Sequence, residues 1–166
     1  MSTFYGTVAA ADAYHTERGN TGWTGTDATK EAALLIASEW LDDHYSEMFA
    51  GYPTDKASQE RAWPRREAYD VYGVYFAIDA IPVQMERATY EIALRQIVSP
   101  GSLFKDWTPG QEKLSVSVVG AVAVTYRGAE TYSDAQVKIG KIDAILRPII
   151  DGNSRASVLS GSAGRV

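Results

Sequence analysis

The sequence predicts an α+β fold that is mainly α: a bundle of about four helices with one β-hairpin and an extended C-terminal arm. Three features lead to this prediction. Apolar residues recur at helical spacing in the segments 28–48, 82–99 and 134–150. The period changes to two between residues 112 and 127, and residues 151–166 are rich in Gly, Ser and Ala. We therefore predict a helical domain, 1–150, with a hairpin near 113–127, and a flexible arm, 151–166.

Composition excludes several classes of protein. The chain has 166 residues, of which 45% are hydrophobic and 22% are charged, as in an ordinary folded domain with a sizeable core. It has no cysteine, so it has neither disulfides nor zinc–thiolate sites. No stretch approaches the ~20 apolar residues that span a bilayer, and no signal-peptide pattern is present. We expect a soluble protein that is made in the cytoplasm and has no membrane partner.

The first predicted helix runs from Val8 to Arg18. Thr7 is suited to cap its start, and Gly19 can adopt the left-handed conformation that ends a helix. Trp23 follows among glycine-containing turns. We expect its indole to close the edge of the core, as a structural anchor.

A second helix is predicted over residues 28–48, with Thr26 or Asp27 as its cap. One continuous stripe at helical spacing includes a second anchor, Trp40. We expect the stripe to face the core; its members are Ala33, Ile36, Ala37, Trp40, Leu41 and His44.

Residues 51–80 are predicted to form a long irregular connection. Loops of this length without structure are uncommon in compact domains, so something must hold the segment in place. Trp63 and Pro64 are the expected anchors, because an indole buries a large area and proline keeps the chain extended. The tyrosines that follow are further candidates for contacts.

The second half begins with a helix that Pro82 opens, since proline suits the first helical position. Its predicted inner stripe is Met85, Ala88, Thr89, Ile92, Ala93 and Gln96. Alternation on both sides of Gly120 predicts a hairpin with a tight turn. Ser133 is expected to cap a last helix, about 134–150, with Pro148 loosening its end. The inward residues of this helix are Ile139, Ile142, Ile145, Leu146 and Ile149.

This order of motifs resembles a phage family that is labelled "putative DnaT-like single-stranded DNA-binding protein". Its members are similar to head–tail connector (adaptor) proteins of long-tailed phages. The resemblance covers roughly residues 4–150. It rests on six short sequence motifs: Tyr5-Gly6-Thr7-Val8, Arg18-Gly19-Asn20, Trp40-Leu41, Ala62-Trp63-Pro64-Arg65, Ile81-Pro82 and Leu146-Arg147-Pro148-Ile149.

The resemblance implies a structural subunit in the neck of a virion. Such subunits form a homo-oligomeric ring, usually dodecameric, beneath the portal protein. The ring extends the DNA channel, without sequence-specific binding, and docks the stopper, tail-terminator or tail protein. Candidate partner contacts lie in the tyrosine-rich segment, the hairpin and the arm: Arg65, Arg66, Tyr69, Tyr72, Tyr75, Val118, Val119, Arg155, Val158, Leu159, Arg165 and Val166.

The alternative function is binding of single-stranded nucleic acid by the region of Trp63-Pro64-Arg65-Arg66, because such binders mix cations with aromatic side chains. Neighbouring acids offset these cations, and residues 1–50 carry eight acidic and two basic side chains. The pairs Asp12/His15 and His44/Glu47 each supply two possible metal ligands without a third. We therefore expect no metal, no cofactor, no catalytic residue and no enzyme activity.

Overall fold

The computed structural model describes residues 4–55, 58–104, 115–116, 124–125 and 139–150. The chain separates into two units, one of residues 1–100 with 139–166 and the other of residues 101–138. In the described residues, four α-helices and short antiparallel strand pairs confirm the predicted α+β, mainly α class. The predicted boundary at residue 150 lies where the description ends, and the arm 151–166 lies outside it.

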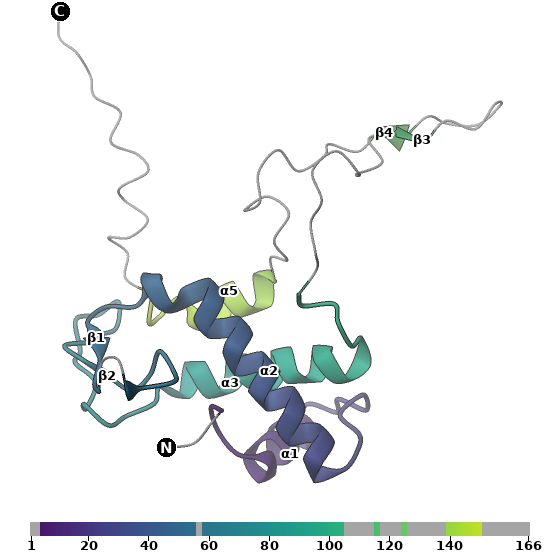
Figure 1. The fold of residues 1–166 in the computed structure, drawn as a ribbon, viewed down its shortest axis with the longest axis horizontal. Helices are drawn as coiled ribbons and strands as arrows, with labels where there is room; N and C mark the ends of the chain where they lie inside the picture. Colours follow the sequence, from purple (N-terminus) through teal and green to yellow (C-terminus); the bar gives the residue numbers. More distant parts are fainter. Residues whose placement is uncertain (1–3, 56–57, 105–114, 117–123, 126–138, 151–166) are drawn as a thin grey trace, which may run out of the picture. The chain divides into compact units, whose positions relative to one another are not determined.

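In the first unit, helix α2 (Asp27–Tyr45) packs on α3 (Val83–Val98), and α3 packs on α5 (Gly140–Leu146) (Figure 1). Helix α1 (Val8–Glu17) contacts both α2 and α3. The largest fully buried side chains of this core include Trp40, Leu34, Met85, Ile92 and Leu146. The core is therefore built from the apolar faces of segments far apart in the sequence.

The starts of α1 and α2 agree with the prediction, and Thr26 is the cap of α2 where Thr26 or Asp27 was expected. The end of α2 does not agree, because the α-helix stops at Tyr45 and a 3-10 helix, η1 (Ser46–Met48), follows it. The Thr7 hydroxyl accepts a hydrogen bond from the Ala10 amide at 3.1 Å, and the Thr26 hydroxyl accepts one from the Thr29 amide at 3.3 Å. Each bond satisfies an amide that the first helical turn leaves free. Gly19 has a φ of +63°, the left-handed conformation expected after α1.

The buried face of α2 is wider than the predicted stripe. Ala33, Ala37, Trp40 and Leu41 are buried, but Ile36 and His44 are only half-buried. The additional buried residues of this helix are Leu34, Ser38 and Tyr45. The physical reason is that α2 is covered by α1 as well as by α3, so one narrow stripe does not account for its contacts.

Helix α3 begins one residue later than predicted, with Pro82 as its N-cap, and Ser99 is its C-cap. Proline fixes φ near its helical value without donating a hydrogen bond, so either position suits it. Its predicted inner stripe is buried except for Gln96, which is half-buried.

The prediction was wrong that the last helix continues to residue 150, because α5 ends at Leu146. Arg147 still has a helical conformation, but Pro148 has no amide hydrogen to donate, so the hydrogen-bond ladder of the helix stops there. Ile150 then forms an antiparallel bridge with Phe49. Ile139, which was predicted to lie within this helix, has an extended backbone and is the N-cap of α5. Ser133 and the predicted residues 134–138 lie outside the described part of the chain.

Residues 51–80 are more regular than predicted. Strand β1 (Tyr52–Pro53) pairs antiparallel with β2 (Arg65–Arg66), with Pro53 opposite Arg65. Gly51, just before β1, has a φ of +70°, and a side chain on it would overlap the backbone of residues 66–68. Backbone pairing and a glycine that permits close approach therefore hold this connection.

In the second unit, β3 (Ser115–Val116) pairs antiparallel with β4 (Val124–Thr125). Ser115 lies opposite Thr125 and Val116 opposite Val124, a register that is symmetric about position 120, as predicted for the hairpin. The turn itself, with Val118 and Val119, lies outside the described residues.

Candidate functional site

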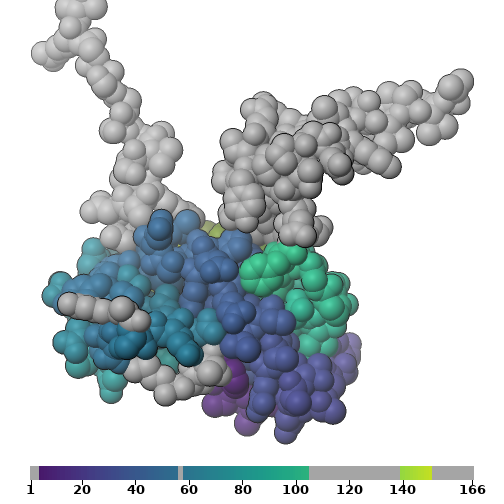
Figure 2. Space-filling view, in the orientation of Figure 1, coloured from purple at the N-terminus to yellow at the C-terminus, as the bar shows by residue number. Residues whose placement is uncertain are grey.

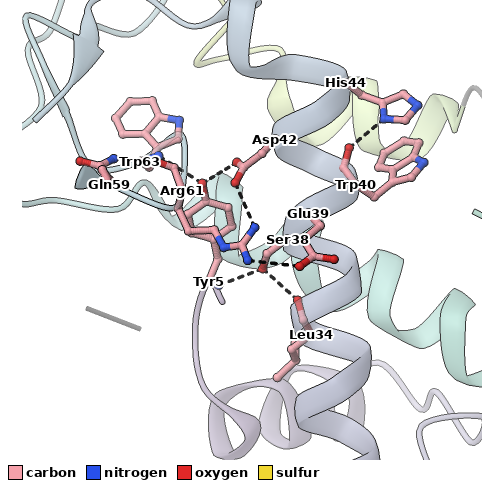
Figure 3. Close-up of polar contacts among 10 residues, drawn as sticks. All are labelled: Tyr5, Leu34, Ser38, Glu39, Trp40, Asp42, His44, Gln59, Arg61 and Trp63. Carbon is pink, nitrogen blue, oxygen red and sulfur yellow. Dashed lines mark hydrogen bonds and ion pairs between the residues drawn. The ribbon is translucent and has the colours of Figure 1, made fainter. Parts of the chain in front are cut away.

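A polar cluster joins the N-terminal segment to α2 and to the segment before β2 (Figure 3). The Tyr5 hydroxyl donates to Asp42 Oδ1 at 2.6 Å and accepts from the Trp63 amide at 3.1 Å. Arg61 Nη1 lies 3.4 Å from Asp42 Oδ2. Burial raises the pKa of the Asp42 carboxyl, while the hydrogen bonds from Tyr5 and Arg61 oppose that rise. The cluster fastens three segments together and leaves Arg61 engaged.

A hollow of about 580 Å³ opens beside this cluster and is lined by Phe4, Tyr5, Ser58, Gln59, Glu60, Arg61, Trp63, Pro64, Asp79 and Ile81. The side-chain amide of Gln59 is already engaged, because its Nε2 donates to the carbonyls of Arg61 and Pro64. The Tyr5 hydroxyl is also used. These two polar groups of the lining are therefore engaged within the protein.

We expect substitution of Tyr5 by phenylalanine to lower the free energy of unfolding by about 2 kcal/mol. The change leaves the buried Trp63 amide without its acceptor and removes one of the donors to Asp42, which keeps Arg61. Urea unfolding followed by circular dichroism measures the loss. Tyr52→Phe is the control, because the Tyr52 hydroxyl is exposed and lies 3.4 Å from Glu67. Equal stability of Tyr5→Phe and the wild type would contradict this role.

The region predicted to bind nucleic acid is largely internal. Trp63 is 2% exposed and lies edge-to-face against Phe49 and Phe76. Arg65 is buried and donates to the carbonyls of Ala50 at 2.9 Å and Gly51 at 2.6 Å. Its other acceptors are the carbonyls of Ala62 and Phe49. Arg65, predicted as a partner contact, is instead a structural residue that holds the start of β1.

The neighbouring predicted contacts lie on the surface. Arg66 is exposed, because successive residues of a strand point to opposite sides and Arg65 takes the inner one. Tyr69 is half-buried, whereas Tyr72 is 85% and Tyr75 70% exposed. Only part of the predicted patch is thus available to a partner.

Residues 69–78, which we call the tyrosine loop, have a fixed backbone. The Asp70 carboxylate accepts hydrogen bonds from the amides of Tyr72 and Val74, both at 2.9 Å. The amide of Val71 donates to the carbonyl of Pro148, and Tyr69 bridges to Tyr75. This segment belongs to the blue-to-teal side of the space-filling view in Figure 2.

The tyrosine loop nevertheless directs large apolar side chains into solvent: Val71, Tyr72, Val74, Tyr75 and Ile78 are all more than half exposed. Apolar exposure concentrated in one ordered loop is typical of an interaction surface. The tyrosines were visible in the sequence, but their exposure was not. Sequence reasoning included the tyrosines and missed the valines and Ile78.

The remaining predicted anchors, Trp40, Trp23 and Pro64, are buried to different extents. Trp40 is fully buried and stacks on His44, with ring centroids 4.0 Å apart. Trp23 is half-buried at the surface of α1, where its indole nitrogen donates to Asp12 at 2.6 Å. Pro64 is half-buried and lines the hollow. The predicted contacts Arg155, Val158, Leu159, Arg165 and Val166 lie outside the described residues.

His15 is a buried structural histidine. Its Nε2 lies 3.2 Å from the carbonyl oxygen of Tyr90, which can only accept, so this nitrogen carries the proton. Its Nδ1 then accepts from Asn20 Nδ2 at 3.0 Å. Both ring nitrogens are occupied, so they are not free to bind a metal. In the part of the chain that the structure describes, no three His, Asp or Glu residues gather into a possible metal site.

We expect the free energy of unfolding to fall as the pH drops below about 6.5, the ordinary pKa of histidine. Desolvation lowers the pKa of His15 in the folded state, although Glu91 and Asp12 partly oppose this. Because the unfolded chain then binds the proton more readily, acid favours unfolding, and the stability is fully present above that pH. The measurement is urea unfolding at pH 7.5 and pH 5.

The control for this pH effect is His15→Gln, whose amide supplies hydrogen-bonding groups without titrating in this range. The two proteins share every other titrating group, including Asp42. The pH-dependent loss should therefore be smaller in the variant. An equal loss in both would show that His15 does not cause it.

A protein-family model matches residues 3–166, and its description is "Putative DnaT-like ssDNA binding protein". The chain belongs to this family. Neither the curated proteins nor the solved structures include a match. Membership of the DnaT-like family confirms the family predicted from the motifs. Among the described helices, none is long and apolar enough to cross a membrane.

Proposed function

We propose that this protein is a structural head–tail connector (adaptor) of a tailed phage, without enzyme activity. In this proposal it forms a homo-oligomeric ring in the virion neck, binds the portal protein and docks the stopper or tail protein. DNA passes through the channel of the ring without sequence-specific binding. The observation that carries the proposal is the tyrosine loop, where a fixed backbone presents exposed apolar side chains.

Such a loop suits protein partners. Interfaces are enriched in tyrosine, and a few aromatic anchors supply most of their binding energy. A loop whose backbone is already ordered loses little further backbone entropy when it binds. The loop also lacks cations: residues 67–79 contain three acidic residues and no basic one. This charge disfavours contact with phosphates and is compatible with DNA that must slide past.

Binding of single-stranded DNA is the second candidate function, and the name of the family favours it. The exposed groups that could serve it are Arg66, Tyr72 and Tyr75, since bases stack on exposed tyrosines and a cation attracts the phosphates. The buried Trp63 and Arg65 could not take part without local unfolding. The two functions therefore predict different partners for the same loop.

We expect Tyr72→Ser to reduce assembly with the portal protein of the same phage at least ~10-fold, as loss of an interface anchor does. The free energy of unfolding should stay within about 0.5 kcal/mol of the wild type, because the side chain is 85% exposed. Co-sedimentation and electron microscopy of the mixed proteins measure assembly, and urea unfolding measures stability.

The control is Val83→Ser, an exposed apolar residue at the start of α3 outside the tyrosine loop. Fluorescence anisotropy with a labelled single-stranded oligonucleotide at low salt distinguishes the second candidate. Failure of the wild-type protein to associate with the portal would contradict the connector function. Salt-dependent oligonucleotide binding that is lost in Arg66→Ala would establish the alternative instead.

A further inference from the structure

An apolar groove of about 310 Å³ lies between α3 and α5, and none of the residues of the tyrosine loop lines it. Its apolar lining residues are Ile92, Leu94, Val98, Ile139 and Ile142, and its charged ones are Glu91, Arg95 and Lys141. Val98 is 61% exposed, although it belongs to a helix whose other large aliphatic residues are mostly covered. A concave apolar surface of this size accepts a protruding side chain of about aromatic size.

Two of the three charged residues that line the groove are basic. The Glu91 side chain is only 7% exposed, accepts from the Tyr14 hydroxyl at 2.8 Å and pairs with Lys141 Nζ at 2.7 Å. The Lys141 side chain remains 62% exposed, and Arg95 is exposed. A partner would therefore meet an apolar lining with Arg95 and with a Lys141 whose charge Glu91 offsets, one net positive charge.

The tyrosine loop has the opposite features. It exposes Tyr72 and Tyr75, and residues 67–79 carry Glu67, Asp70 and Asp79 without a basic residue. Exposed aromatic side chains suit an apolar groove, and the acids of the loop suit the net positive charge of the groove lining. Complementary potentials of this kind select a partner and fix its orientation.

We propose that the tyrosine loop of one subunit inserts into the α3–α5 groove of the next copy of this chain. The contact is head-to-tail, because two different surfaces of each subunit take part, and repetition of such a contact closes a ring when the rotation allows it. The proposal rests on the ring-forming connector function and names the surfaces that build the ring. Tyr72 and Tyr75 supply the anchors, so that a cysteine at position 72 leaves Tyr75 to seat the loop. The exposed Arg95 faces the acids that flank the loop.

The absence of cysteine from the chain allows a direct cross-linking test. Three full-length variants are needed: Tyr72→Cys, Val98→Cys, and a control, Val83→Cys, which replaces an exposed valine at the other end of α3. A short bismaleimide joins thiols that lie close together. Mixing Tyr72→Cys with Val98→Cys should give a covalent dimer, and the yield should exceed that with Val83→Cys roughly ten-fold.

A chain that carries both Tyr72→Cys and Val98→Cys should give a ladder of covalent multimers, because each subunit then offers both halves of the contact. Adding Arg95→Glu to the Val98→Cys chain should lower the cross-linked yield several-fold, since the acidic loop would meet an acidic groove lining. Arg95 is exposed, so this change leaves the fold intact.

Several results would overturn the proposal. Tyr72→Cys cross-linking to itself as efficiently as to Val98→Cys would place loop against loop. Equal yields with Val83→Cys would show random collision. A Val98→Cys thiol that a monofunctional maleimide cannot label would show a closed groove. Absence of a Tyr72–Val98 product, whether the chain oligomerises or stays monomeric, would also overturn it.

The outcomes separate this contact from the connector function. Wild-type protein that associates with the portal while the Tyr72–Val98 product is absent would leave the connector in place and remove only this contact. A specific Tyr72–Val98 product from a protein that does not bind the portal would support this contact and contradict the connector function. Each inference can therefore fail without the other.

Discussion

Arg65→Met is expected to lower the free energy of unfolding by about 3–4 kcal/mol, because four carbonyls lose a buried, charged donor at once. Two of these acceptors, Ala50 and Gly51, directly precede β1. Methionine restores most of the volume and none of the hydrogen bonds. Urea unfolding followed by circular dichroism measures the loss.

Arg66→Met is the matched control, since the adjacent arginine is exposed on the other side of β2. Its stability should remain within about 0.5 kcal/mol of the wild type. Arg65→Lys should recover only part of the loss, because an ammonium group cannot reach acceptors that surround a planar guanidinium. Similar stabilities for Arg65→Met and Arg66→Met would contradict the structural role of Arg65.

Trp63→Ala is expected to cost about 3–5 kcal/mol, the range for removal of a buried large aromatic side chain. The indole packs edge-to-face against Phe49 and Phe76, with ring centroids 5.7 and 5.4 Å away, so its loss leaves a cavity between two segments. The temperature midpoint and the urea midpoint should both fall. Calorimetry and urea unfolding measure these changes.

Tyr72→Ala serves as the aromatic control, because the same truncation at an exposed position leaves no cavity. Trp63→Phe should be intermediate, since it keeps one ring. The competing view, in which Trp63 stacks on nucleic acid, predicts another pattern. Under that view Trp63→Ala would leave stability unchanged and would abolish oligonucleotide binding.

The sequence predicted the helices well where local signals were strong. Thr7 and Gly19 were predicted to cap α1, and Thr26 or Asp27 to cap α2; the structure confirms the first two and places Thr26 at the start of α2. Caps depend on hydrogen bonds within four residues of the chain, so the sequence contains all the information that they need. The inner stripe of α3 was also predicted, because its apolar residues recur on one side of the helix. Helices α2 and α5 pack on α3 in the structure.

Contacts between distant segments were harder to predict. The pairing of β1 with β2 was missed because each strand has only two residues, too few for a period to be visible. The wider buried face of α2 was also missed, since Leu34 and Tyr45 are covered by elements far away in the sequence. Such coverage is a property of the packed helices and not of the α2 sequence alone.

The candidate site shows the same limit for individual residues. By itself, the sequence determined the family, the fold class and the presence of an aromatic, cation-containing segment around Trp63. Only the tertiary structure decided that Trp63 and Arg65 lie inside while Arg66 and Tyr72 face solvent. The reason is physical: adjacent residues of equal chemistry differ in which side of the backbone they occupy, and distant segments determine which side is covered.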